Sequence, residues 1–538
     1  MAMNRYPRYF IASLSVAFFC AFGQQVPQDW HLLDPETDGV QGLSVEKAYR
    51  SLLKGRTARP VIVAVIDSGI DPDHEDLKSV IWTNSREVAG NGRDDDGNGY
   101  TDDIHGWSFI SGKGGDVGPD SYEVTREFVR LDARFANLTP DRVRKSDMND
   151  YAYYQTVKAR YEEKLATDKK QYDLYRSVYT NLKFSLDTIK SVLGPGPYDQ
   201  DRLTSVQSEN PVIIFAKSVL LKLLKDTGGG DLHETLGQVK EGYDYFSNIV
   251  EHGLNTGFDP RPIVGDDYAD KSERAYGTAS VQGPDAEHGT HVAGIIAAVR
   301  DNGLGVRGIA DHARIMILRA VPDGDERDKD IASAIQYAAD NGARIINMSF
   351  GKEFSPDKAV VDAAVRYAER KGVLFVHAAG NDAKNIDEVD QYPSRKMLKG
   401  RAPAAWIEVG ASGPGKDADL PAEFSNYGKR MVDVFAPGVD IHSTVPGGQY
   451  KNNSGTSMAA PAVAGVAAML MSYFPDYSAA EIKELIVSSA RRFDGLKVKQ
   501  PGSADEVDMN QLCQTGGVVN AFEAVKLAAS RQSMKTKR

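Results

Sequence analysis

Three short segments carry side chains that could act together in nucleophilic chemistry. Ser457 stands in NSGTSMAAPAVAGV, His288 in HGTHVAGIIAA and Asp67 in VIDSGID. A serine hydroxyl is a weak nucleophile near neutral pH, so it needs a base such as imidazole to take its proton, and a third group can orient that base. The three residue types therefore favour attack of an activated hydroxyl on a carbonyl carbon.

Each of these residues also has a simpler interpretation when it is taken alone. A serine before an alanine-rich run is typical of a helix N-cap, and an aspartate after a strand is often a cap. A lone histidine at a helix start is more often a polar surface or core residue than a base. The combination is informative because Asp67, His288 and Ser457 each follow a predicted strand or begin a predicted helix.

The elements that must position these residues alternate between strands and helices. The β-branched run at 60–66, PVIVAVI, predicts a buried strand that delivers Asp67 at its carboxyl end. Helical patterns cover 330–341 and 356–371. Further strand-like runs lie at 313–318, 345–349, 373–378, 406–410 and 432–435. This alternation predicts an α/β fold with a doubly wound parallel sheet, whose carboxyl edge favours functional groups.

The region 113–275 breaks the alternation. Apolar and aromatic residues recur every three or four positions from Tyr151 to Leu193, where the sequence GPGP follows, and a second seam runs through 232–250. These seams predict a long helical hairpin or small bundle. The tyrosines of the first seam are expected to pack internally, with ligand binding as the alternative.

The three segments around Asp67, His288 and Ser457 resemble the signature blocks of the subtilisin-like serine peptidases, the subtilase family. The resemblance implies a subtilisin-like fold with Ser457 as nucleophile, His288 as general base and Asp67 as the carboxylate that orients it. It also implies that Asn381, in VHAAGND, donates to the developing oxyanion together with the Ser457 backbone N–H. The ordinary alternative for a loop asparagine is a turn former.

The resemblance extends to substrate binding. The segment NMSFG is similar to the family segment that pairs with an extended peptide as an added strand, and AAG after the strand at 373–378 would form the opposite wall of the first pocket. The candidate substrate-binding residues are Ser349, Phe350, Gly351, Ala378, Ala379 and Gly380, with Gln391, Tyr392 and Pro393 at the base of the pocket. The alternative for the first three is an ordinary strand end.

The acidic stretch DDDGNGYTDD has the oxygen spacing of a calcium loop. The twelfth position is His105 instead of a bidentate glutamate, so a helix–loop–helix calcium hand is not expected. Asp76, in HEDL, matches another calcium ligand position of the resembling family. The predicted cofactor is structural calcium, with a solvated acidic turn as the alternative. The candidate metal residues are Asp76, Asp94, Asp96, Asn98, Tyr100 and Asp102.

The amino-terminal residues predict export. Two arginines precede the apolar run 9–22, which is typical of a signal peptide over 1–23. The expected location is periplasmic or extracellular, with a lipid anchor on Cys20 as the alternative. No stable membrane span is expected elsewhere. The formal net charge of −11 argues against a nucleic-acid partner, and without Cys20 the remaining Cys513 has no partner for an intrachain disulfide.

The sequence thus predicts an exported serine endopeptidase that acts on proteins or peptides. The alternatives are a catalytically silent peptide-binding protein of the same fold, and a scaffold that acts through its helical insertion. No folding pro-domain of the family type fits ahead of Asp67, so the insertion is a candidate for folding help, partner binding or gating of access. The predicted parts are a signal peptide at 1–23, catalytic segments at 24–112 and 276–530, a helical insertion at 113–275 and a tail at 531–538.

Overall fold

The computed structural model describes residues 26–535, so the predicted signal peptide lies outside the described residues. The chain divides into two compact units. The larger unit contains 26–133 and the chain from 256 onward, and the smaller unit contains 134–255. The flanks of the predicted insertion, 113–133 and 256–275, therefore belong to the larger unit.

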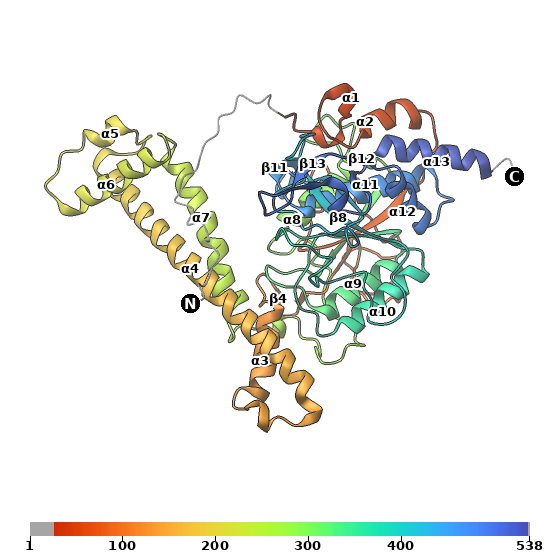
Figure 1. The fold of residues 1–538 in the computed structure, drawn as a ribbon, viewed down its shortest axis with the longest axis horizontal. Coiled ribbons are helices and arrows are strands. Elements are labelled where there is room, and N and C mark those ends of the chain that lie inside the picture. The colour runs from red at the N-terminus through yellow and green to blue at the C-terminus, as the bar shows by residue number, and fades with distance from the viewer. Residues whose placement is uncertain (1–25, 536–538) are drawn as a thin grey trace, which may run out of the picture. The chain divides into compact units, whose positions relative to one another are not determined.

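Within the described residues, a nine-stranded sheet forms the centre of the larger unit (Figure 1). Neighbouring strands are parallel except for the pair β12 and β15. In spatial order the strands are β12 (Arg491–Arg492), β15 (Gly517–Val518), β9 (Val434–Pro437), β8 (Trp406–Ser412), β7 (Leu374–Ala378), β6 (Ile345–Met348), β1 (Val61–Asp67), β5 (Ala313–Arg319) and β2 (Gly106–Ser108). The predicted doubly wound parallel sheet is confirmed.

The first strand of the sheet lies at its centre. β1 pairs with β5 on one side and with β6 on the other, and the later strands β7, β8 and β9 follow outward from β6. Functional groups of such sheets gather outside the carboxyl ends of strands where the order reverses. Asp67 ends β1 and Ser349 follows β6, so both lie at this switch point.

Alternate residues of β1 enter two hydrophobic cores, one on each face of the sheet. Val63 and Val65 pack with α8 (Glu287–Ala297), α11 (Thr456–Tyr473), α12 (Ala479–Ser488) and α13 (Ala521–Lys535). Ala64 and Ile66 pack with α9 (Asp328–Asp340) and α10 (Lys358–Arg370). Figure 1 shows α9 and α10 together on one side of the sheet. Within the described residues, α11 is the one helix long and apolar enough to span a membrane, and 89% of it is buried.

Short elements complete the larger unit. In the part of the chain that the structure describes, three hairpins pair β3 (Ser111–Gly112) with β4 (Gly115–Asp116), β10 (Ile441–Val445) with β11 (Gln449–Asn453), and β13 (Lys497–Lys499) with β14 (Glu506–Asp508). The short helices α1 (Pro35–Asp38) and α2 (Val45–Ala48) lie near the start, and α3 (Glu123–Phe135) leads toward the smaller unit.

The smaller unit is helical. Its elements are α4 (Met148–Leu193), α5 (Gln200–Thr204), α6 (Pro211–Asp226) and α7 (Leu232–Asn248). The 46-residue α4 confirms the predicted first seam. The ring of Tyr243 stacks on Tyr172 at 6.0 Å and on Tyr179 at 5.2 Å between centroids, and Tyr175 stacks on Phe246 at 5.3 Å. These tyrosines therefore pack between α4 and α7.

Candidate active site

Asp67 and His288, which are distant in sequence, are hydrogen bonded at the edge of the sheet. His288 is the second residue of α8, and its Nδ1 lies 2.7 Å from Asp67 Oδ1. The neighbouring Gly289 permits this approach, since a Cβ there would lie 2.2 Å from the Gly69 carbonyl oxygen. Asp67 Oδ1 also accepts the Ser68 N–H at 2.8 Å. The carboxylate is thus held in place to orient the imidazole.

Burial and Asp67 act on the pKa of His288 in opposite directions. Burial lowers this pKa, but the charge of Asp67 and its hydrogen bond raise it by more, so the pKa lies above the ordinary value of 6.5. The side chain of His288 is 38% exposed, whereas that of Asp67 is 3% exposed. The imidazole is therefore accessible to solvent. Because its pKa is raised, it loses its proton at a pH above 6.5.

Ser457 lies in the first turn of α11 and is bonded to the chain that follows β6. Its hydroxyl donates to the Ser349 carbonyl at 3.2 Å, and the Ser349 hydroxyl donates to the Ser457 carbonyl at 3.0 Å. The neighbouring Thr456 hydroxyl accepts the Gly380 N–H at 3.1 Å. The turn that carries Ser457 is thus attached to the chain after β6 and to the chain after β7.

Asn381 contacts the same turn. Its Oδ1 accepts the N–H and the hydroxyl of Thr456, both at 2.9 Å, which directs Nδ2 away from them. Asn381 Nδ2 and the Ser457 backbone nitrogen lie 3.5 and 3.6 Å from one point, the position that a Cβ on Gly455 would take. Two nitrogen donors therefore border the same space next to Gly455, an arrangement that could stabilise a negative oxygen.

The side chain of Gln391 lies between the two expected walls of the first pocket. A Cβ on Gly351 would lie 2.8 Å from Gln391 Nε2, and a Cβ on Gly380 would lie 2.7 Å from the same atom. Gln391 Oε1 accepts from Asn426 Nδ2 at 3.0 Å, so the amide has a fixed orientation. Phe350 and Gly351 follow Ser349, Ala378 ends β7, and Ala379 and Gly380 come directly after it.

A buried pair positions the wall that follows β6. His377 on β7 contacts Glu408 on β8, with 2.7 Å between Nδ1 and Oε1. Its Nε2 lies 3.0 Å from the Phe350 carbonyl oxygen and donates to it, because a carbonyl can only accept. Sequence reasoning missed this pair, although a histidine within an otherwise apolar strand was a visible signal.

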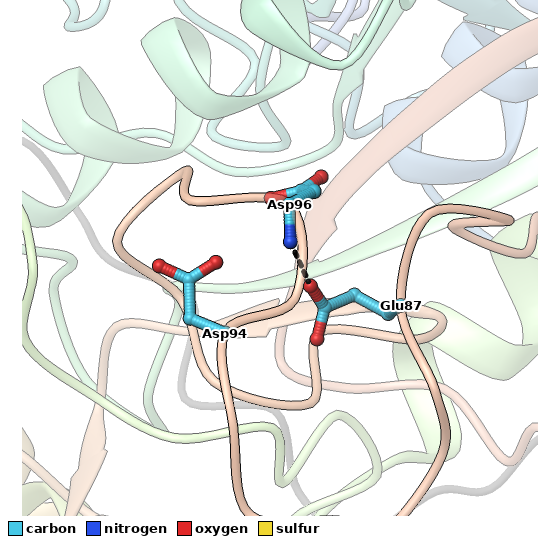
Figure 2. Close-up of side chains that lie close together, drawn as sticks. All are labelled: Glu87, Asp94 and Asp96. Carbon is cyan, nitrogen blue, oxygen red and sulfur yellow. Dashed lines mark hydrogen bonds between the residues drawn. The ribbon is translucent and has the colours of Figure 1, made fainter.

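Three carboxylates come together in the acidic loop (Figure 2). The oxygens of Glu87, Asp94 and Asp96 lie within 4.8 Å of one another. Glu87 Oε1 accepts the N–H groups of Asp95 and Asp96 at 2.8 and 3.0 Å, which fixes it against the loop. An all-oxygen donor set of this kind suits calcium. The cluster could therefore hold a metal ion. Glu87 lies outside the loop in sequence, so the spacing gave no signal for it.

The remaining predicted residues of the loop have other contacts. Asn98 Oδ1 accepts the Tyr100 N–H at 2.8 Å. Asp102 accepts the backbone N–H groups of Asn91 and Gly92 at 3.1 and 2.9 Å. These bonds shape the loop, and Asp102 is outside the three-carboxylate cluster of the described residues.

Asp76 is likewise outside that cluster. It is fully buried and accepts from Asn302 Nδ2 at 2.6 Å, from the Val306 N–H at 3.2 Å and from the Tyr450 hydroxyl at 3.3 Å. The structure therefore brings Asp94 and Asp96 together with Glu87 and gives Asp76 a different set of partners.

The chain matches a known family model and several known proteins. A family model described as the Subtilase family matches residues 58–518, more than half of the chain. The chain is 38% identical over 272 residues to the thermophilic serine proteinase of Bacillus sp. (strain AK1), which covers 50% of this chain and 56% of that protein. It is 38% identical over 240 residues to thermitase of Thermoactinomyces vulgaris, and the aligned residues make up 44% of this chain and 75% of that protein.

A third relative is the cell wall-associated protease of Bacillus subtilis (strain 168). The two chains are 39% identical over 207 residues, which covers 38% of this chain and 21% of that protein. The chain thus spans about half of the length of the Bacillus sp. proteinase and about a fifth of the cell wall-associated protease.

Proposed function

This chain belongs to the subtilase family, and we propose on that premise that it is a serine endopeptidase. The observation that carries the proposal is the 2.7 Å hydrogen bond between His288 and Asp67, at the sheet edge where Ser349 contacts Ser457. These residues supply the three groups that the reaction needs, a nucleophile, a base and an orienting carboxylate.

The reaction begins when the Ser457 hydroxyl turns from the Ser349 carbonyl toward His288. His288 takes the proton as the oxygen attacks the carbonyl carbon of the peptide bond, and Asp67 stabilises the resulting imidazolium. His288 then returns the proton to the leaving amine as the C–N bond breaks. Water, deprotonated by the same imidazole, hydrolyses the ester on Ser457 and restores the free hydroxyl.

Asn381 and the Ser457 backbone N–H stabilise the negative oxygen of the tetrahedral intermediate. The convergence of these two donors supports this role. The substrate pairs with Ser349, Phe350 and Gly351 as an added strand. Its side chain next to the cleaved bond enters the pocket between this wall and the one formed by Ala378, Ala379 and Gly380.

Calcium is the proposed structural ion. Asp94 and Asp96 would hold it together with Glu87, and their clustered carboxylates support the assignment. Asn98, Tyr100 and Asp102 would shape the loop around it, and Asp76 remains a predicted ligand outside this cluster. When bound, the ion neutralises the carboxylates and stabilises the folded loop.

The chain is proposed to act outside the cytoplasm, on protein or peptide substrates. The signal-like pattern at 1–23 supports export, as does similarity to a relative named as cell wall-associated. The helical unit at 134–255 is proposed to gate access of substrates or to bind a partner.

Labelling with a fluorophosphonate probe tests the proposed function. The wild-type protein should be labelled and should hydrolyse casein, and Ser457→Ala should lose both properties while keeping its thermal unfolding temperature. Ser454→Ala is the matched control, because Ser454 is an exposed serine three residues away and should not be needed. A folded wild-type protein that binds peptides without labelling or hydrolysis would instead support a silent peptide-binding protein.

A further inference from the structure

The segment after β6 offers its backbone groups to a peptide at alternate residues. The Phe350 carbonyl accepts from His377 in the core, whereas the Ser349 carbonyl accepts from the Ser457 hydroxyl. Successive residues of an extended segment face opposite sides, so Gly351 faces the same side as Ser349. Counting peptide residues back from the cleaved bond, the first residue therefore pairs with Ser349 and the third pairs with Gly351.

Lys352 comes directly after these pairing residues and is fixed by three oxygen acceptors. Its side chain is 1% exposed, and the ammonium lies 2.8 Å from Glu123 Oε2, 2.7 Å from the Glu326 carbonyl oxygen and 2.8 Å from Asp328 Oδ1. Three acceptors use the full donor capacity of an ammonium group. Since a buried charge is costly to leave unpaired, this side chain stays where it joins the chain after β6 to the start of α9.

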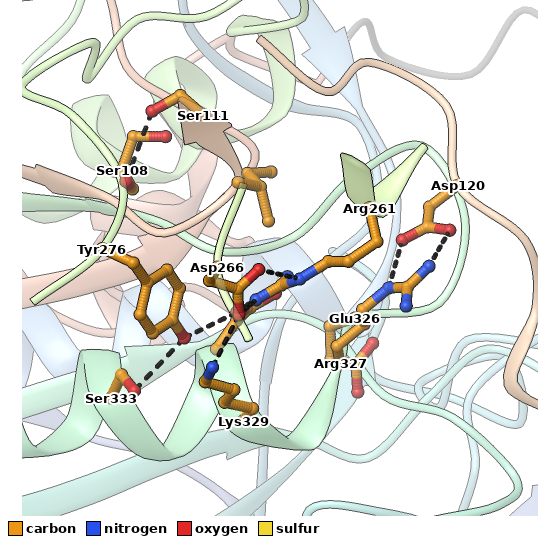
Figure 3. A network of polar contacts seen from close by, with 12 residues as sticks. Ser108, Ser111, Asp120, Arg261, Asp266, Tyr276, Glu326, Arg327, Lys329 and Ser333 are labelled. Carbon is orange, nitrogen blue, oxygen red and sulfur yellow. Dashed lines mark hydrogen bonds and ion pairs between the residues drawn. The ribbon is translucent and has the colours of Figure 1, made fainter. Parts of the chain in front are cut away.

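The chain before α3 holds the loop before α9 in place. The Asp323 N–H donates to the Gly118 carbonyl at 3.0 Å, and the Asp120 N–H donates to the Asp323 carbonyl at 3.1 Å. The Asp120 carboxylate accepts two hydrogen bonds from Arg327, at 2.7 and 2.9 Å (Figure 3). Backbone and side-chain hydrogen bonds therefore both join the chain before α3 to the loop before α9.

The first turn of α3 adds further contacts to this loop. The Glu123 N–H donates to Asp325 Oδ2 at 2.8 Å, and Arg126 donates to Glu123 Oε2 at 2.8 Å and to the Asp325 carbonyl at 3.1 Å. A cavity beside Lys352, lined also by Ile331 of α9 and by Tyr392, has a volume of about 10 Å³. That volume suits one water molecule and excludes an amino-acid side chain.

We propose that Lys352 and the first turn of α3 close the substrate cleft on its acyl side, the side that binds the peptide residues before the cleaved bond. The closure lies directly after the position of the third such residue. The enzyme then selects on the first three peptide residues before the cleaved bond and is indifferent to the side chain of the fourth. The inference rests on the proposed peptidase function, and it assigns a specificity role to the chain that leads into the helical unit.

A series of blocked fluorogenic peptides tests the proposal on the wild-type protein. All peptides share one favourable first residue, taken from library profiling, and extend to three, four or five acyl-side residues, with Gly, Ala, Phe, Lys or Glu in the fourth position. Within the four- and five-residue peptides, kcat/KM should vary by less than about threefold with the fourth side chain, whereas a pocket for it would give about tenfold or more. Variation of threefold or more would overturn the proposal.

The same series separates this inference from the proposed function. Hydrolysis with a preference at the fourth residue would overturn only the inference. Failure of all the peptides, together with absence of fluorophosphonate labelling, would remove the peptidase function and the inference with it.

A double variant tests whether Lys352 and Glu123 are responsible for the closure. Lys352→Ala combined with Glu123→Ala removes a cation and an anion together, so it leaves the net charge unchanged. In this double variant, kcat/KM for the peptide with Phe in the fourth position should exceed that for the peptide with Gly by about fivefold or more. Arg300→Ala with Glu46→Ala removes another ion pair and should leave the profile unchanged. A folded Lys352 variant that stays indifferent would contradict the assignment.

Discussion

At the scale of single residues, the charge of His288 decides in the proposed mechanism whether Ser457 can be activated. The imidazole must be neutral to accept a proton, and the pKa of His288 is raised above 6.5 because Asp67 outweighs the effect of burial. We therefore expect kcat/KM to rise with pH through a midpoint above 6.5. Asp67→Asn should lower kcat by about 10⁴-fold and move the midpoint downward. A pH profile of kcat/KM measures both effects.

Glu287→Gln is the control for this prediction. Glu287 also raises the pKa of His288, but its contribution is smaller than that of Asp67, so the midpoint should move less and kcat should be nearly unchanged. An unaltered midpoint in the Asp67 variant would contradict the assigned coupling.

The two ends of the Asn381 amide have separable roles. Nδ2 is the proposed oxyanion donor, whereas Oδ1 accepts from Thr456 at the start of α11. Asn381→Asp keeps the acceptor and loses the donor, so kcat should fall by about 10²–10³-fold without loss of stability. Asn381→Ala should lose similar activity and also about 1 kcal/mol of unfolding free energy. Steady-state kinetics and urea unfolding measure the two quantities, and a fully active aspartate variant would exclude the donor role.

Gln391 is expected to limit the depth of the first pocket. Its amide lies against Gly351 and Gly380 and is held by Asn426. Gln391→Gly removes that amide and should shift cleavage toward larger aromatic first residues, by about tenfold in the ratio of kcat/KM for Phe over Ala. Library profiling of both proteins measures the shift. Asp390→Gly changes the exposed neighbouring residue and should leave the ratio unchanged.

At the scale of elements, the sequence predicted those parts of the fold that have a regular pattern. The β-branched runs located β1 and β5, and the heptad seam located α4. The sequence pattern could not separate the flanks of the helical insertion from the helices themselves. Ion pairs hold these flanks to the larger unit, and ion pairs leave no periodic pattern in a sequence. Arg261 contacts Asp330 on α9 at 2.6 Å, and Arg327 contacts Asp120 at 2.7 Å. Glu87 was missed for a similar reason, since folding alone brings it to the acidic loop.

The acidic loop should depend on calcium for its stability. Removing an ion that binds only the folded state lowers stability, so a chelator should reduce the unfolding temperature by roughly 3–8 °C. Glu87→Gln should reduce this difference by about half or more. Asp102→Asn should preserve it, because Asp102 is outside the carboxylate cluster. Differential scanning fluorimetry with and without chelator gives the comparison, and calcium titration calorimetry supplies a second readout. An equal chelator response in the Glu87 variant would contradict this site.

At the scale of the whole molecule, the division into two compact units predicts where the chain tolerates deletion. Replacing 134–255 by a short Gly/Ser linker leaves the larger unit complete. We expect this protein to fold, to be labelled by a fluorophosphonate and to show a lower helical signal by circular dichroism. If the helical unit gates access, cleavage of intact casein should also increase relative to cleavage of a short peptide.

Deletion of 113–275 should behave differently, because it removes partners from buried charges of the larger unit. Lys352 would lose Glu123, Arg327 would lose Asp120, and Asp330 would lose Arg261. Breaking one buried pair in this way costs about 3–5 kcal/mol, so the combined loss should prevent folding. Thermal unfolding and fluorophosphonate labelling of the two deletion variants and of the full chain measure whether each variant folds. Equal stability of both would show that the flanking ion pairs are dispensable, and that the larger unit does not need the chain leading into the helices.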